Sequence, residues 1–94
     1  MKIIGKKKLF AFIKKHVDAR EWIENWIKDV EGCRWRLPQD VKDRYATASF
    51  LADRVVIFNV RGNHYRLETQ IAYQVGTVAV KWAGTHAEYT QRYK

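Results

Sequence analysis

The chain of 94 residues is 47% hydrophobic, which excludes a disordered protein and allows one core, so we expect a single domain over residues 1–94. Its one cysteine, Cys33, excludes an internal disulfide, and no stretch approaches the about 20 apolar residues of a membrane helix, so a cytoplasmic protein is expected. The formal net charge of +8 at pH 7 favours a polyanionic partner such as RNA, DNA or an acidic protein, with a merely basic surface as the alternative.

The first segments of the chain predict a strand and a helix. Lys2–Ile4 is short and apolar and could form an edge strand. Apolar residues then recur at helical spacing, at Leu9, Phe12, Ile13 and Val17. The same segment carries a basic run of Lys6, Lys7, Lys8, Lys14 and Lys15. Such a run is usually a solvated helix face, but it can also hold a phosphate backbone.

A second helix is predicted next. Asp18 lies three residues before Glu21, which is the spacing of a capping box that opens a helix. An apolar stripe follows, formed by Trp22, Ile23, Trp26, Ile27 and Val30. Tryptophans at this spacing indicate a core-facing helix rather than a platform for stacked bases, and Gly32 is a natural end. Further on, Asp40 can cap a short helical turn that runs to Tyr45.

The residue pattern of the second half of the chain predicts β-strands. Val55–Val60 is mostly β-branched or aromatic, and residues 61–64 supply a turn. Tyr65–Ala72 then alternates between two sets of side chains. A turn near Gly76 leads into another alternating segment, Thr77–Ala83. The turns are short enough to join these strands as hairpins.

Side-chain parity limits how the last two strands pair. Leu67 and Ile71 lie on the same face as Val80 and Trp82 only if the turn near Gly76 contains an even number of residues. A turn of four residues sets Leu67 opposite Trp82. The apolar face that results can be covered by the two amphipathic helices. We therefore expect Trp82 in the core.

The same register gathers polar side chains on the other face, which we expect to remain open. Glu68 then lies opposite Lys81, so that Arg66 and Lys81 share this face, and the preceding hairpin adds Asn59 beside Arg66. An arginine on an open face suits phosphate, because its planar guanidinium offers paired donors and stays charged. An ion pair of Arg66 with Glu68, or with another acid at the strand surface, is the alternative interpretation.

The segment Gly84–Tyr89 is a second candidate for chemistry. Thr85 and Glu88 have the spacing of a capping box, so the stretch can simply open a last helix. A helix start also directs free amide donors outward, and these attract phosphate. His86 would lie in that first turn as a candidate general base. Tyr89, three residues on, would lie on the same side of the helix.

The stretches Val56–Leu67 and Gly84–Tyr89, with Tyr73 between them, are the most distinctive in the chain. Together they resemble the HigB toxin family of type II toxin–antitoxin systems, in the RelE/ParE-like group. The resemblance covers nearly the whole chain. It implies a compact α+β fold in which two N-terminal helices pack on a curved antiparallel sheet, with a short C-terminal helix beside it.

The resemblance also implies an activity and partners. Relatives are endoribonucleases, called mRNA interferases, that cut messenger RNA, commonly on the translating ribosome, and so inhibit translation and growth. Each is silenced by an antitoxin, here a HigA-like one, that carries a helix-turn-helix DNA-binding domain. The toxin would therefore meet operator DNA only through its antitoxin, and no membrane is involved.

The reaction expected on this basis is metal-free attack of the RNA's own 2′-hydroxyl on the adjacent phosphorus. It needs a base, an acid and cations around the phosphate. His86 and Tyr89 would share the proton transfers, while Arg66 and Lys81 stabilise the phosphate charge. No metal or cofactor is expected, because the histidines are scattered and lack metal-ligand spacing. The residues expected to hold RNA are Lys6, Lys7, Lys8, Asn59, Arg61, Asn63 and His64.

One position departs from the family pattern. Members commonly carry Asp directly after the last motif tyrosine, whereas Thr90 follows Tyr89 here. If that acid assists catalysis or orients His86, this chain is a slower nuclease or uses another group in its place.

Two other functions stay open at this point. ParE-like toxins have the same broad fold and poison DNA gyrase by binding alone, although the motif of His86 and Tyr89 argues against a pure binder. A basic adaptor that only binds nucleic acid is the third interpretation. Growth arrest on expression, rescued by a neighbouring gene, would discount the adaptor.

Overall fold

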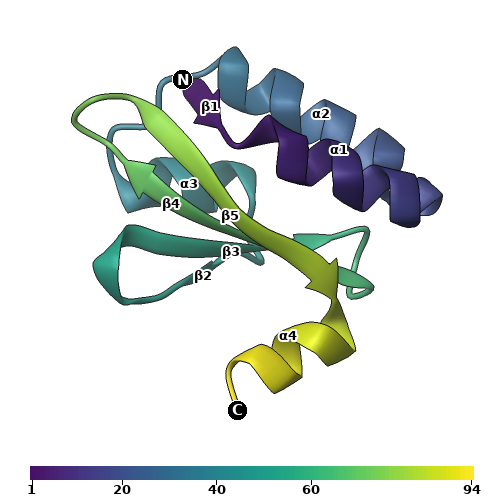
Figure 1. Cartoon of the computed structure of the whole chain (residues 1–94). Helices are drawn as coiled ribbons and strands as arrows, with labels where there is room; N and C mark the ends of the chain where they lie inside the picture. The colour runs from purple at the N-terminus through teal and green to yellow at the C-terminus, as the bar shows by residue number, and fades with distance from the viewer.

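The computed structural model describes residues 1–94 as a five-stranded sheet with four α-helices (Figure 1). The strands are β1 (Lys2–Ile4), β2 (Ser49–Phe50), β3 (Val55–Val60), β4 (Tyr65–Ala72) and β5 (Thr77–Thr85). The helices are α1 (Lys6–Lys15), α2 (Arg20–Glu31), α3 (Pro38–Arg44) and α4 (His86–Arg92), with short 3-10 turns at Val17–Ala19 and Ala52–Arg54. The strand order is β1-β5-β4-β3-β2.

The sheet is mixed rather than purely antiparallel. Strand β1 pairs in parallel with the first residues of β5, from Lys2 opposite Thr77 to Ile4 opposite Ala79. The prediction of an antiparallel sheet was therefore wrong at this edge and right for the other pairs. A parallel neighbour is possible here because α1 and the later elements supply the long connection that two parallel strands require.

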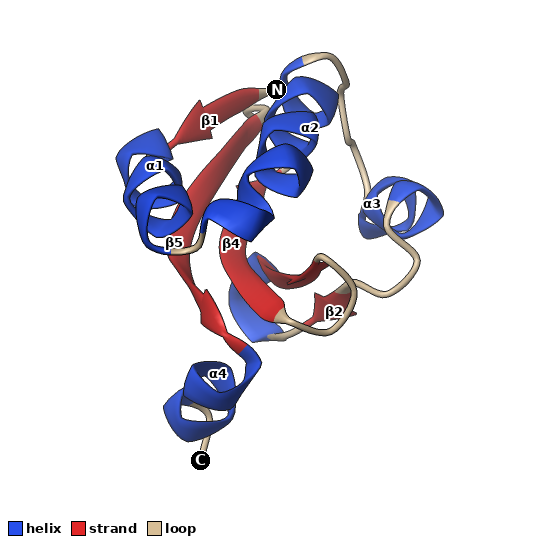
Figure 2. Ribbon diagram, turned by 90° about the vertical axis from the view of Figure 1, so that its right-hand side faces the viewer, coloured by secondary structure: helices blue, strands red, loops and turns tan.

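Helices α1 and α2 lie side by side on one face of the sheet (Figures 1 and 2). Leu9, Phe12 and Ile13 of α1 are buried as predicted, but Val17 lies beyond the helix and is 64% exposed. Helix α3 adds Val41 to the same core, so three helices cover this face rather than two.

The link between α1 and α2 contradicts the predicted capping box. The chain passes from the 3-10 turn into α2 through Ala19 in a helical conformation, so no extended N-cap residue is present. The carboxylate of Asp18 instead accepts hydrogen bonds from the Tyr65 hydroxyl at 2.6 Å and from Arg61 at 3.1 Å. The hydrogen bond from Tyr65 holds the pKa of Asp18 below its usual value. Asp18 therefore fastens the β3–β4 turn to the helical layer.

The apolar stripe of α2 lies in the core, as predicted. Ile23, Trp26 and Val30 are fully buried, and Trp22 and Ile27 pack against the same cluster. The ring of Trp26 meets that of Phe58 edge-on, with centroids 5.5 Å apart. The Trp26 indole N–H is buried and has no hydrogen-bond partner. This helix contributes packing rather than a base-stacking surface.

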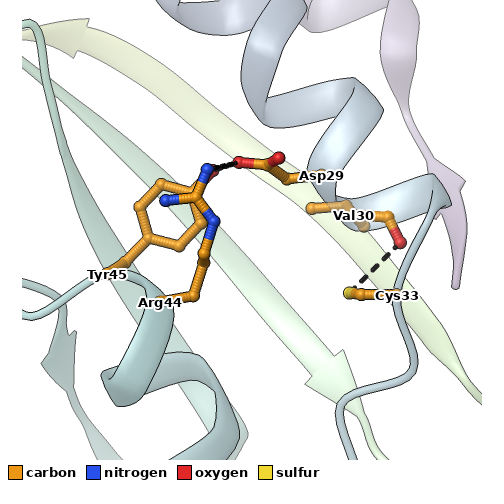
Figure 3. A network of polar contacts seen from close by, with 5 residues as sticks. All are labelled: Asp29, Val30, Cys33, Arg44 and Tyr45. Carbon is orange, nitrogen blue, oxygen red and sulfur yellow. Dashed lines mark hydrogen bonds and ion pairs between the residues drawn. The ribbon is translucent and has the colours of Figure 1, made fainter.

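A polar network joins the end of α2 to α3 (Figure 3). The Asp29 carboxylate accepts a hydrogen bond from the Tyr45 hydroxyl at 2.6 Å and pairs with Arg44. Burial, together with the nearby Asp29, raises the pKa of Tyr45, so the phenol stays a donor. Asp40 lies inside the first turn of α3, where its carboxylate accepts the backbone N–H groups of Arg36 and Leu37. It therefore caps from within the helix rather than from the N-cap position predicted.

A β-bulge changes the register of the last hairpin. The turn between β4 and β5 has the four residues that parity predicted, and pairs such as Thr69 opposite Val80 follow from it. Lys81 is then an extra residue without a partner, so Glu68 lies opposite Trp82 and Leu67 opposite Ala83. The predicted pairs of Leu67 with Trp82 and of Glu68 with Lys81 were wrong, because a one-residue bulge exchanges the two faces of a strand beyond it.

Candidate functional site

The polar face of the sheet is covered by α4 rather than open. Figures 1 and 2 show α4 at the end of β5, apart from the paired helices α1 and α2. The Glu68 carboxylate on β4 accepts hydrogen bonds from the Arg92 guanidinium at 2.9 Å and the Tyr93 hydroxyl at 2.7 Å. Arg66 and Glu68 are each only 8% exposed, and Ile57, opposite Glu68, is 1% exposed. The prediction of an open polar face was wrong at Glu68 and Arg66, because Arg92 and Tyr93 bond to Glu68, and Arg66 is buried beside Tyr89.

We expect acid to weaken the docking of α4. Burial raises the pKa of the Glu68 carboxyl, but the hydrogen bonds from Arg92 and Tyr93 outweigh it and hold the pKa below its usual 4.5. A carboxylate with a lowered folded-state pKa stabilises fully above its unfolded pKa, and this contribution is lost as pH falls through the folded value. The Tyr93 NMR signals should therefore be constant above about pH 5 and shift below about pH 4.

The control for this titration is Glu68→Gln, which removes the titrating group. Its Tyr93 signals should show no transition in that acid range. A wild-type spectrum of Tyr93 that stays constant down to about pH 2 would contradict a role of ionised Glu68 in holding α4.

Arg66 is a buried cation without a carboxylate partner. Its guanidinium donates to the Asn63 side-chain oxygen at 2.6 Å and to the Tyr65 carbonyl oxygen at 3.1 Å, and no ion pair is formed. The alternative interpretation, a pair with Glu68 or another acid, was wrong, because Arg92 occupies the Glu68 carboxylate and no other acid pairs with Arg66. The guanidinium lies 5.8 Å from the centre of the Tyr89 ring. The structure thus brings together three of the predicted residues, Asn63, Arg66 and Tyr89.

His86 begins α4, and the predicted capping box forms behind it. The Thr85 hydroxyl accepts the Glu88 backbone N–H at 3.1 Å, and the Glu88 carboxylate accepts the Thr85 N–H at 2.8 Å. The His86 backbone N–H donates to the His64 carbonyl oxygen at 3.0 Å, which brings the two histidine backbones together. The His86 imidazole is exposed and makes no hydrogen bond. The Thr90 hydroxyl donates to the His86 carbonyl oxygen at 3.1 Å.

Trp82 links the sheet to α4. Its ring lies over Gly84, where a Cβ atom would stand 2.7 Å from a ring carbon and 2.9 Å from a Glu88 carboxylate oxygen. The ring centre is 6.5 Å from that of Tyr89, and the Arg92 guanidinium lies 5.2 Å above it. The β-bulge therefore moves Trp82 out of the predicted core position and into the surroundings of Tyr89.

The predicted RNA-binding lysines do not act as one group. Lys6 pairs with Glu31 of α2, and Lys7 is exposed without a contact. Lys8 lines a hollow of about 390 Å³ between α1, β5 and the start of α4, together with the predicted catalytic residue Lys81. The other lining residues are Ala11, Phe12, Lys15, His16, Trp82, Ala83, Gly84 and Glu88.

Sequence reasoning did not select His16 or Trp82 for this site. The helical spacing could have indicated His16, because it follows Phe12 by four residues and Lys8 by eight, on the same helix face. Its ring lies 5.0 Å from that of Phe12. No signal in the sequence locates the bulge that directs Trp82 here.

The remaining predicted residues lie elsewhere. Arg61 is paired with Asp18, and His64 is exposed in the β3–β4 turn. Asn59, opposite Arg66 as predicted, lines a second hollow of about 510 Å³ with Asn63. The structure therefore divides the predicted RNA-binding set between two hollows, two ion pairs and two exposed positions.

These features define the class of the protein. It is a small mixed α/β protein with a basic hollow and a buried arginine beside a tyrosine. Residues 19–92 match the family described as HigB_toxin, RelE-like toxic component of a toxin-antitoxin system, and the chain belongs to this family. The five-stranded sheet with four helices is compatible with a RelE-like fold. No curated protein matches the chain. No helix combines the length and apolar composition needed to span a membrane.

Proposed function

We propose that this toxin is a messenger RNA endoribonuclease that acts on the translating ribosome without a metal ion. The observation that carries the proposal is the Arg66 guanidinium, buried without a counter-ion and adjacent to the Tyr89 phenol. An unpaired buried cation is costly unless a ligand compensates it, and a phosphate is a suitable ligand for a guanidinium. A phenol beside it supplies a group that can transfer a proton.

The proposed reaction uses the RNA's own 2′-hydroxyl as the nucleophile. A bond forms between the 2′-oxygen and phosphorus, and the bond to the 5′-oxygen breaks, which leaves a 2′,3′-cyclic phosphate and a 5′-hydroxyl. Tyr89 and His86 share the transfer of the proton from the 2′-oxygen to the leaving 5′-oxygen. Arg66 stabilises the negative charge on the oxygens of the cleaved phosphate, and Lys81 adds positive charge from the neighbouring hollow. Asn63 acts as a positioning residue, because it holds the Arg66 guanidinium.

Antitoxin control completes the proposal. Family membership implies an antitoxin partner. We propose that this partner is HigA-like, carries a helix-turn-helix domain, and connects the toxin to operator DNA. The proposed substrate would place the free toxin in the cytoplasm, where translation takes place.

Transcript-end mapping after brief expression tests the proposal. New internal messenger ends bearing 5′-hydroxyl groups are expected, and they should disappear when translation is blocked beforehand. Tyr89→Phe removes only the hydroxyl and should lower cleavage by about 100-fold or more. The matched control is Tyr73→Phe, since the Tyr73 hydroxyl makes no hydrogen bond and lies at the far end of β4.

Two results would overturn this function. Cleavage by Tyr89→Phe at the wild-type rate would remove the phenol from the mechanism. Accumulated DNA breaks without new messenger ends would instead indicate a gyrase poison of the ParE type. Both variants should first be shown to melt at the wild-type temperature, so that a loss of activity reflects chemistry.

A further inference from the structure

The hollow between α1, β5 and α4 has a cationic wall. We call it the lysine pocket; Lys8, Lys15 and Lys81 line it, and none of them forms an ion pair. Its one carboxylate, Glu88, is engaged in capping α4 through the Thr85 N–H. The pocket therefore carries more positive than negative charge.

The fold explains why this pocket exists. Strand β1 pairs only with Thr77–Ala79, because the chain leaves the sheet at Gly5 and enters α1. The rest of that edge of β5 has no neighbouring strand and forms one side of the pocket. Helix α1 forms the other side, with Lys8 and Lys15 two turns apart on the same face.

The lining suits a phosphate attached to an organic group. Lysine ammonium groups bind phosphate as compact point charges. Phe12 and the Trp82 ring add apolar surface beside them. Trp82 also lies next to Tyr89, with ring centres 6.5 Å apart, so the pocket adjoins the Arg66–Tyr89 pair. An acidic protein would need a broader surface than one hollow, since stable protein interfaces bury about 800 Å² on each partner.

We propose that the lysine pocket binds a backbone phosphate of the RNA, next to the linkage that is cleaved. This assignment rests on the proposed nuclease function and extends it by naming the part of the substrate that the pocket takes. It also gives the α1 lysines different roles: Lys8 and Lys15 contact RNA, while Lys14 does not.

Lys14 and Lys15 provide a matched pair for the test. Both are exposed neighbours on α1, but Lys14 faces the groove between α1 and α2, where Phe10 and Glu24 lie. Binding of a short 2′-O-methyl RNA, which cannot be cleaved through its 2′-position, is measured by fluorescence anisotropy at several salt concentrations. Lys15→Gln should weaken binding by about fivefold or more and reduce the salt slope by about 0.7, as expected for one lost phosphate contact on a single strand. Lys14→Gln removes the same charge and should weaken binding less than about twofold.

Equal losses in the two variants would overturn the pocket, because they would indicate general attraction to a basic surface. A second result would also overturn the proposal: binding of a polyglutamate peptide that depends on Lys15, together with RNA binding that does not. The pocket would then serve an acidic protein. Lys8→Gln, a second variant from the same wall, should reproduce the Lys15→Gln result.

Cleavage of unmodified RNA is scored separately, so that the two proposals can fail independently. Binding that depends on Lys15, without cleavage by the wild type on ribosomes, would retain the pocket and reject the nuclease. Cleavage lost in Tyr89→Phe, with equal binding by Lys14→Gln and Lys15→Gln, would retain the nuclease and reject the pocket.

Discussion

Arg66→Lys should lower RNA cleavage by about 100- to 1000-fold, the range for loss of one preorganised donor to a developing negative charge. Lysine keeps the positive charge but loses the planar, paired donors that Asn63 aligns through its 2.6 Å hydrogen bond. The rate of 2′,3′-cyclic phosphate formation on programmed ribosomes measures the loss.

The matched control is Arg36→Lys, because the Arg36 side chain is exposed and makes no contact through its guanidinium. This variant should cleave at the wild-type rate. Asn63→Ala should give an intermediate loss, since Arg66 keeps its bonds to backbone carbonyl oxygens when the side-chain oxygen is removed. Normal cleavage by a folded Arg66→Lys protein would show that the paired donors of Arg66 are not needed. It would contradict the proposed role of Arg66 at the phosphate.

Trp26→Ala should lower the free energy of unfolding by about 3–5 kcal/mol, the usual cost of truncating a buried large aromatic residue. Trp26→Phe should cost much less, about 1–2 kcal/mol, because the lost indole N–H has no hydrogen-bond partner and the remaining ring can keep its edge-on contact with Phe58. Urea unfolding followed by circular dichroism gives both values.

The contrast between the two substitutions at Trp26 is the informative result. If Trp26→Phe proved as costly as Trp26→Ala, the indole N–H would have a partner in solution, such as a buried water. Trp82→Phe is a suitable comparison, because Trp82 lies outside the core cluster, and its substitution should change stability less than Trp26→Ala.

The features that the sequence predicted correctly depend on short-range patterns. Alternation and turn residues located β3, β4 and the four-residue turn, and the spacing of Thr85 and Glu88 located the start of α4. Parity also placed Asn59 opposite Arg66. Each of these depends on residues close together in the chain or on one hairpin register.

The features that the sequence did not predict depend on contacts between distant residues. Asp18 does not cap a helix, as its spacing predicted, but accepts a hydrogen bond from Tyr65, which lies 47 positions further along the chain. Glu68 prefers Arg92, 24 positions away, to its neighbour Arg66. The bulge at Lys81 has no local marker, because the alternation of side chains continues through it. Competition between partners, decided by the packed structure, determines these choices.

The same bulge divides β5 into two parts with different tolerance to substitution. Before the bulge, Val78 and Val80 lie in the core and residues 77–79 pair with β1, so replacement of either valine should destabilise the whole fold. After Lys81 the strand carries Trp82, which lies outside the core cluster and beside Tyr89, so replacement of Trp82 should affect mainly the surroundings of Tyr89. In the proposed nuclease, the cleavage rate can therefore change through mutation of Trp82 without loss of the folded protein that an antitoxin binds.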